Sequence, residues 1–294
     1  MRIRNTRGAA VFGVFNYTVL SLAAVLCLFP IIHVLALSFS ASTAAMTGKV
    51  TVWPVDFTTK SYQFVMESPA FIRAFFVSLK RIALGAPINM LLTIFAAYPL
   101  SKTRSRFRAR NVFLWYFVIT MLFSGGLIPT YMMVFRTGLI DSIWALILPG
   151  AVPVFNVILL LNFLRGIPKE MEEAAFIDGA GHWYTLWKVL LPLCKPVLAT
   201  LLLFVVVGHW NSWFDGLIYM NTNTKYPLQS YLQTAIVTIG SRIFNRSEIE
   251  LLKYINDRTS RAAEIFIAMV PILMVYPFLQ RYFTKGIVLG SVKG

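Results

Sequence analysis

The stretch EEAAFIDGAGHWYTLWKVLLP, residues 172–192, places carboxylates beside two alanines and a Gly-x-Gly in an otherwise apolar chain. The protein has 12 acidic residues in total. Four of them, Glu170, Glu172, Glu173 and Asp178, fall within nine positions here. Whether such a cluster does chemistry, binds a partner or only caps a helix depends on where the surrounding apolar segments place it.

The composition is that of a membrane protein. Of 294 residues, 57% are hydrophobic and 13% are charged, with a mean hydropathy of +0.69. A soluble domain is about half apolar and about a quarter charged. A soluble core of this length cannot bury so much apolar surface, so lipid is the expected solvent. The net charge of +15 comes from Lys and Arg between the apolar runs, which indicates topology signals rather than a nucleic-acid-binding face.

Six apolar segments are long enough to cross a bilayer as helices, which takes about 20 residues each. They cover residues 11–39, 71–100, 112–134, 143–164, 193–220 and 263–281. The first follows three arginines, but its apolar run is too long for a cleaved signal, which favours an uncleaved anchor. Pro and Gly interrupt the last three segments, either as packing kinks or because they line a substrate path.

The distribution of Lys and Arg predicts that both termini are cytoplasmic. With the N-terminus inside, the inner segments carry roughly twice the density of basic residues of the outer ones, and SKTRSRFRAR (101–110) supplies five. This topology puts residues 165–192 in the cytoplasm and the polar loop 222–262 outside. Arg73, Lys80 and Arg81 then lie at the outer interface, where we expect their long side chains to extend to water.

The loop 165–192 reads as two short helices joined by a reversal. Pro168 suits a first helical turn, and the glutamates lie near the start of that helix, where the dipole favours negative charge. Gly179 or Gly181 can adopt positive φ and reverse the chain, and the second helix runs to Pro192. The small-residue surface at Ala174 and Ala175 is either a plug for a groove on another protein or an ordinary solvated loop.

No other pattern indicates an enzyme or a metal site. Cys27 and Cys194 lie apart in apolar surroundings, and the three histidines are far apart in sequence. No phosphate loop, dinucleotide fingerprint or nucleophile elbow is present in the sequence. We therefore expect no catalytic, cofactor-binding or metal-ligating residues, and no bound cofactor.

The pattern Glu173-Ala174-Ala175-x-x-Asp178-Gly179, followed by Leu191-Pro192, resembles the EAA loop of ABC importer permeases. In that family the loop is a coupling helix that docks in a cleft of a separate ATPase subunit. The resemblance implies a set of ATPase-coupling residues: Glu172, Glu173, Ala174, Ala175, Asp178, Gly179 and Gly181.

Three further stretches are similar to maltose-type carbohydrate permeases: AYPLSK (97–102), residues 128–160, and WNSWFDGLIYMN (210–221). FSGGLIPTYMM and LILPGAVPVFN most resemble the Lpl-type subfamily, which takes up larger or uronate-bearing oligosaccharides. The resemblance covers the chain from about residue 10 to its end. It also implies an ATPase-contacting tail formed by Gly290, Ser291, Val292, Lys293 and Gly294. Tyr98-Pro99 departs from the Tyr-Ala of many relatives.

The resemblance implies an all-α integral membrane protein with six transmembrane helices in the type I ABC importer (MetI-like) permease fold. The expected parts are an anchor helix and outer loop (1–70), a core (71–281) and a cytoplasmic tail (282–294). The implied partners are a second homologous permease, two ATPase subunits that use ATP and Mg, and an extracytoplasmic solute-binding protein. An oligosaccharide would cross a bacterial cytoplasmic membrane, and the chain would have no ATPase site and bind no nucleic acid.

The sugar path is the least specified part of the sequence. Trp210, Asn211, Trp213 and Asp215 combine stacking faces with hydrogen-bonding groups, which suits sugars. The alternative is an interfacial aromatic belt, which we favour for Trp213 and Tyr219, while Asn211 and Asp215 stay open.

Basic residues would suit an anionic sugar, and Arg73, Lys80 and Arg81 are the candidates in the second segment. The main alternative function is an ion- or proton-coupled secondary sugar carrier, and a structural membrane-assembly protein is another. A carrier needs an intramembrane relay. Its candidates, His209, Asp215 and Glu264, are expected to stand singly near segment ends.

Overall fold

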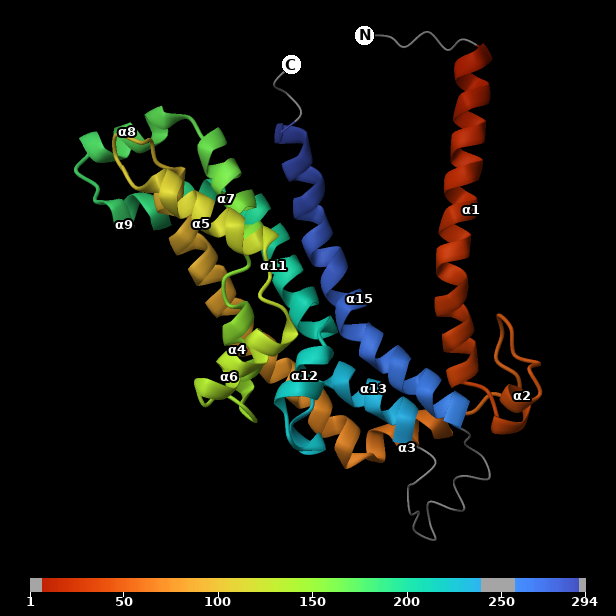
Figure 1. The fold of residues 1–294 in the computed structure, drawn as a ribbon. Coiled ribbons are helices and arrows are strands. Elements are labelled where there is room, and N and C mark those ends of the chain that lie inside the picture. Colours follow the sequence, from red (N-terminus) through yellow and green to blue (C-terminus); the bar gives the residue numbers. More distant parts are fainter. Residues whose placement is uncertain (1–6, 239–256, 291–294) are drawn as a thin grey trace. The chain divides into compact units, whose positions relative to one another are not determined.

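The computed structural model describes residues 7–238 and 257–290, and these ranges contain helices and no strand. Figure 1 shows these helices in their order along the chain. The chain divides into two compact units. Unit one comprises Met1–Pro69 and Val237–Val270, and unit two comprises Ala70–Ile236 and Pro271–Gly294. The helix α15 (Asp257–Gly290) contributes residues to both units.

Unit one is built around α1 (Arg7–Ser38), which has the character of a lipid-facing helix. Its 32 residues span about 48 Å at 1.5 Å each, more than a bilayer core. An 18-residue stretch within Gly8–Ser38 has a mean hydropathy of 2.5, yet only 6% of that stretch is buried. Apolar side chains exposed all round a helix are expected where the solvent is lipid.

The segment after α1 folds back onto its end. It contains α2 (Ser42–Met46) and α3 (Lys60–Glu67). The Ser38 hydroxyl lies 2.7 Å from the Tyr62 hydroxyl, and the Phe39 ring packs 4.6 Å from the Tyr62 ring between centroids. These contacts fasten the predicted outer loop to the end of α1.

Unit two holds the other described helices, which pack around a main apolar core and a smaller cluster that includes Val134, Leu146 and Tyr219. Its first half consists of α4 (Pro69–Ser101), α5 (Arg110–Leu122), α6 (Leu127–Arg136), η1 (Ile143–Leu146), η2 (Leu148–Gly150) and α7 (Val154–Gly166). Its second half consists of α8 (Lys169–Ile177), α9 (His182–Tyr184), η3 (Thr185–Leu190), α10 (Leu191–Leu193), α11 (Lys195–Asn211), α12 (Phe214–Tyr219), η4 (Asn223–Lys225) and α13 (Leu228–Thr238). The core joins α4, α7 and residues 186–201, with Ala97, Leu160 and Leu201 fully buried.

Several predicted spans are bent or broken rather than continuous. The described residues contain two helices that pass as membrane spans by length and apolarity, or up to five if each bent pair is one span. The predicted span 112–134 turns by 115° between α5 and α6, because Gly126 adopts φ +87° and Pro129 follows in the first turn of α6. The predicted span 143–164 bends by 46° before α7, at Pro153.

The predicted span 193–220 is the largest departure from the sequence-based expectation. α11 turns by 84° from the preceding helical segment His182–Leu193, and it ends at Asn211 before the short α12. The first part of the predicted outer loop 222–262 contains the helix α13, which packs on α4. The Leu228 amide donates to the Ser78 hydroxyl on α4 at 2.8 Å. The rest of that loop, 239–256, lies outside the described residues.

Asp141 fastens the turn after α6 to the end of α12. Gly138 (φ +70°) ends α6, and Asp141 itself has φ +62°, an uncommon conformation for a residue with a side chain. The Asp141 amide donates to the Tyr219 carbonyl at 2.8 Å, and its carboxylate accepts the Asn221 amide and pairs with Lys225. The Lys225 ammonium holds the pKa of Asp141 below its usual range.

Gly216 sets the approach of α12 to the start of α13. A Cβ at position 216 would overlap the Ser230 hydroxyl and lie 2.8 Å from Pro227 Cδ. We expect Gly216→Ala to lower the free energy of unfolding by about 1–3 kcal/mol, as overpacking does. Thermal unfolding of the purified protein measures this. Gly208→Ala is the matched control, since nothing lies within 4 Å of its Cβ, and an equal effect of the two changes would contradict the close-approach explanation.

Candidate functional site

The stretch that carries the sequence motif forms a well-terminated short helix, α8. Its backbone begins after Pro168, and Glu170 and Glu172 lie in the first turn, where the helix dipole favours them. At the other end Gly179 adopts φ +80°, so the predicted reversal occurs at Gly179 and not at Gly181, which is extended at φ −76°. The Gly179 amide donates to the Phe176 carbonyl, and the Ala180 amide to the Ala175 carbonyl, which is a Schellman motif.

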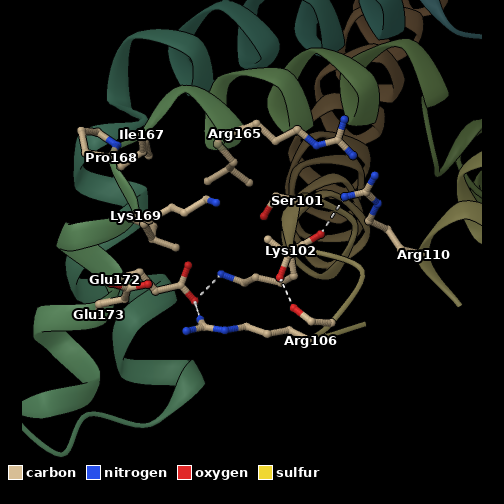
Figure 2. A pocket seen from close by; sticks show the side chains of 14 residues that line it. Ser101, Lys102, Arg106, Arg110, Arg165, Ile167, Pro168, Lys169, Glu172 and Glu173 are labelled. Atoms are coloured by element: carbon tan, nitrogen blue, oxygen red, sulfur yellow. Dashed lines mark hydrogen bonds and ion pairs between the residues drawn. The ribbon is translucent and has the colours of Figure 1, made fainter. Parts of the chain in front are cut away.

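Glu172 joins α8 to the end of α4. Its carboxylate accepts the Lys102 ammonium at 2.7 Å and the Arg106 guanidinium at 3.0 Å, as Figure 2 shows. The Lys102 side chain is only 10% exposed. Burial lowers the pKa of Lys102, and the hydrogen bond to Glu172 opposes that shift. The ammonium therefore depends on Glu172 for its countercharge.

Two further contacts strengthen this junction. The Tyr98 hydroxyl lies 3.2 Å from His182 Nδ1, and the His182 ring packs edge-on against Phe176 at 5.1 Å. The Arg165 guanidinium donates to the Leu100 carbonyl at 3.2 Å, at the carbonyl-rich C-terminal end of α4. α9 and the end of α7 are thus bound to the last turn of α4, while α8 is bound to the residues that follow it.

A basic cavity of about 420 Å³ opens beside the junction. Figure 2 shows Lys169 and Arg110 at its walls together with the Glu172 ion pairs. Glu173 also lines the cavity, but the Glu173 residue is exposed. Ala174, Asp178, Gly179 and Gly181 are also exposed, and Ala175 is half-buried. The Glu172 carboxylate therefore contacts residues of its own chain, while most of the other predicted coupling residues are exposed.

A second candidate site lies in the first half of α4, around Arg81. Its guanidinium forms a bidentate pair with Asp215 and donates to His209 Nδ1 at 3.2 Å and to the Leu146 carbonyl at 3.0 Å. Asp215 also accepts the Ser212 hydroxyl at 2.8 Å and the Gly216 amide at 2.9 Å. The cluster joins α4, η1, α11 and α12.

This cluster corrects two expectations. Arg81 is only 3% exposed, so its side chain does not extend to water, whereas Arg73 and Lys80 are exposed. The prediction that His209 and Asp215 stand singly is also wrong, because both contact the Arg81 guanidinium. A charge inside an apolar bundle is costly unless paired, and the cluster supplies that pairing.

The cluster borders a cavity of about 490 Å³. Asn89, Asn156, His209 and Asp215 provide polar walls, and Phe204 and Pro149 are among the apolar ones. Gly85 leaves room for the His209 imidazole, since a Cβ at position 85 would lie 2.6 Å from His209 Nε2.

The four predicted substrate-path residues take different positions. Asp215 lines the 490 Å³ cavity, as does Tyr219. Trp210 is buried and packs edge-on against Phe75 at 5.7 Å. Asn211 and Trp213 are exposed and do not line this cavity. Of the predicted tail, Gly290 is the last residue of α15, and residues 291–294 lie outside the described part of the chain.

Sequence reasoning missed Asn89 and the partners of Glu172. The available signal was the four-residue spacing of polar or small residues inside an apolar helix: Arg81, Gly85, Asn89 and Thr93. For Glu172 the signal was the basic run after AYPLSK, which the positive-inside rule already explained and which therefore gave no reason to look for a partner.

Comparison with known proteins gives a consistent result. Residues 4–289 match the family model described as "Binding-protein-dependent transport system inner membrane component". Protein LplC of Bacillus subtilis is 39% identical over 293 residues, covering 99% of this chain and 98% of the relative. The polygalacturonan/rhamnogalacturonan transport system permease protein YtcP of Bacillus subtilis is 37% identical over 283 residues, covering 96% and 98%.

A solved structure is similar over almost its whole length. It is a chain of a bacterial ABC transporter involved in the import of the acidic polysaccharide alginate. The two share 32% sequence identity and a TM-score of 0.88, covering 96% of this chain and 99% of that one. The bends within the spans therefore belong to a fold that is shared with that transporter.

The Glu172 junction can be tested by removing its charge. We expect Glu172→Gln to destabilise α8 by about 1–3 kcal/mol, because Lys102 would lose the countercharge that its burial requires. Amide hydrogen exchange of residues 169–177 should become faster. Glu170→Gln is the control: the residue is exposed and also lies in the first turn. Equal exchange in the two variants would contradict the junction.

The Arg81–Asp215 pair can be tested by comparing single and double changes. Arg81→Leu should cost roughly 3 kcal/mol of unfolding free energy, because it leaves Asp215 with an uncompensated charge. Arg81→Leu with Asp215→Leu should recover much of that loss, since an apolar pair satisfies the same space. Thermal unfolding of Arg81→Leu, Asp215→Leu and the double variant measures these losses. A loss of unfolding free energy in the double variant equal to the sum of the two single losses would contradict the pairing.

Proposed function

The chain belongs to the binding-protein-dependent transport system inner membrane component family, and on that premise we propose that it is one membrane subunit of an ATP-driven oligosaccharide importer. Uronate-containing oligosaccharides are the proposed substrate class. The names of the relative that serves polygalacturonan and rhamnogalacturonan and of the alginate importer support this class. As a transport component the chain is not itself an enzyme.

The observation that carries the proposal is the geometry of α8. It presents exposed small and acidic residues on one side, while Glu172 binds the end of α4 on the other. A short helix bound in this way can pass a push or pull from a docked partner to α4. We propose that Glu173, Ala174, Ala175, Asp178, Gly179 and Gly181 form the ATPase-docking surface, with Glu172 as its attachment to α4.

The assembly that this role requires has several other members. It would contain a second permease, two ATPase subunits that bind ATP and Mg, and a solute-binding protein on the outer face. The chain would cross the bacterial cytoplasmic membrane six times with both termini inside. Its parts would be the anchor and outer loop (1–70), the core (71–281) and a tail (282–294), in which 290–294 contact the ATPases. The family description and the long apolar helices α1 and α4 support the membrane location.

Coupling would work by a shift between two packed arrangements. Closure of the ATPases on ATP favours one arrangement of α8 and α9. The bonds of Glu172 in α8 to Lys102 and Arg106, and of His182 in α9 to Tyr98, carry that preference to α4. A binding protein that delivers sugar favours the same arrangement from the other side. The energy thus enters as differential binding to two states.

Gly179→Trp tests the docking surface. Nothing lies within 4 Å of a Cβ at this position, so the new side chain would project outward, and φ +80° strains it. We expect the variant to reach the membrane but to lose most sugar-stimulated ATP hydrolysis and uptake in the reconstituted transporter, because the ring would occupy the docking interface.

Gly138→Trp is the matched control for strain. It has φ +70° and open space around its Cβ, but it lies in the turn after α6. We expect this variant to keep its coupling. Unimpaired transport by the Gly179 variant, or equal loss in both variants, would contradict the assigned docking role.

A further inference from the structure

Unsatisfied polar atoms gather along one buried face of α4. Asn89 and Thr93 are four residues apart, so they lie above one another on the helix. Asn89 Oδ1, Thr93 Oγ1 and His209 Nε2 are buried without a hydrogen-bond partner among the described residues. Leaving such a group unpaired costs about 1–3 kcal/mol. Three together in one bundle indicate that something other than protein satisfies them.

Two of these atoms belong to residues that line the 490 Å³ cavity, and their chemistry is complementary. The Asn89 amide donates to the Gly150 carbonyl at 3.2 Å, which leaves its oxygen as a free acceptor. His209 Nδ1 accepts from Arg81, so the neutral imidazole carries its hydrogen on Nε2, a free donor. The cavity thus offers one acceptor and one donor.

The cavity offers no free charge in addition. Arg81 uses four hydrogen bonds on Asp215, His209 and the Leu146 carbonyl. Asp215 is further satisfied by Ser212 and the Gly216 amide. A carboxylate entering this space would have to displace Asp215 from Arg81, whereas a hydroxyl, which both donates and accepts, matches the unpaired acceptor and the unpaired donor.

We propose that this cavity binds ring hydroxyls of a sugar unit in transit, with Asn89 Oδ1 as acceptor and His209 Nε2 as donor. Arg81 is a positioning residue that holds the imidazole, and Gly85 makes the space for it. Phe204 and Pro149 supply apolar surface for the C–H faces of the ring. The inference rests on the proposed function and deepens it: this subunit recognises hydroxyls common to neutral and acidic sugars, not the carboxylate.

Access to the cavity can be measured first, by cysteine labelling. In the complete transporter, with Cys27 and Cys194 replaced by Ala, Asn89→Cys should react with a water-soluble methanethiosulfonate. Leu91→Cys is the control, because Leu91 is exposed on a different face of α4 and is expected to face lipid. Faster labelling at 89 than at 91, slowed while sugar is transported, is the expected result. Equal rates, or no slowing, would overturn the proposal.

Transport kinetics then separate hydroxyl from carboxylate recognition. The probes are a trigalacturonate and its methyl ester, which keeps the hydroxyls and removes the charge. Loss of one hydrogen bond predicts that Asn89→Leu raises the KM for uptake of both probes about tenfold, which corresponds to about 1.4 kcal/mol. His209→Gln, which keeps an acceptor for Arg81 and a donor for the sugar, should raise the KM less than His209→Leu, which keeps neither.

The outcomes distinguish a failure of the hydroxyl site from a failure of the proposed substrate class. An increase in KM confined to the acidic probe, or no increase, would overturn the hydroxyl site, provided that the unchanged transporter imports the probes. Import of neither probe by the unchanged complex would contradict the proposed substrate class, and the labelling experiment would then decide on the cavity alone. The thermal unfolding temperature of each variant complex separates lost uptake from lost folding. His209→Leu is expected to lower it, because the buried Arg81 guanidinium loses an acceptor.

Discussion

The structure of unit two depends on the pairing of charges along α4, a helix that would otherwise be too apolar to specify its neighbours. Arg81 pairs with Asp215 in the first half of α4, and Lys102 pairs with Glu172 just beyond its C-terminal end. The two cations are 21 residues apart in sequence, or about 31 Å along a helix, which matches the thickness of a bilayer core. Because an unpaired charge is costly in low dielectric, each pair fixes one neighbour in register: α12 at Arg81 and α8 at Lys102.

This arrangement lets one element serve two tasks. The face of α4 between the two pairs carries Gly85, Asn89 and Ala97, so it borders the polar cavity and then the apolar core. A displacement imposed on α8 can therefore reach residues that line the cavity through one continuous helix. No long chain of loop contacts is needed, which suits a protein that transmits work rather than performing chemistry.

The sequence predicted the all-helical membrane class, the family and the conformation of loop 165–192, because these depend on local signals. Apolar length, Pro168, the glutamates and Gly179 each act within a turn or two of the chain. The bends were not predictable in the same way. Residues 112–134 read as one apolar run, in which Gly125 and Gly126 permit a turn but do not require one. The Arg81 cluster was missed because its partners lie 128 and 134 residues away in sequence, and a basic residue near a span end has a simpler explanation in interfacial placement.

The close approach of Gly85 to His209 also constrains how the protein can diverge. The imidazole occupies the volume that a methyl group at position 85 would need, so neither site is free to vary by itself. A relative with a larger residue at 85 must carry a smaller one at 209, or move α11 away from α4 and open the cavity. Sequence change at this pair therefore alters cavity size in steps, and a single helical glycine becomes a point at which related transporters can diverge in what they admit.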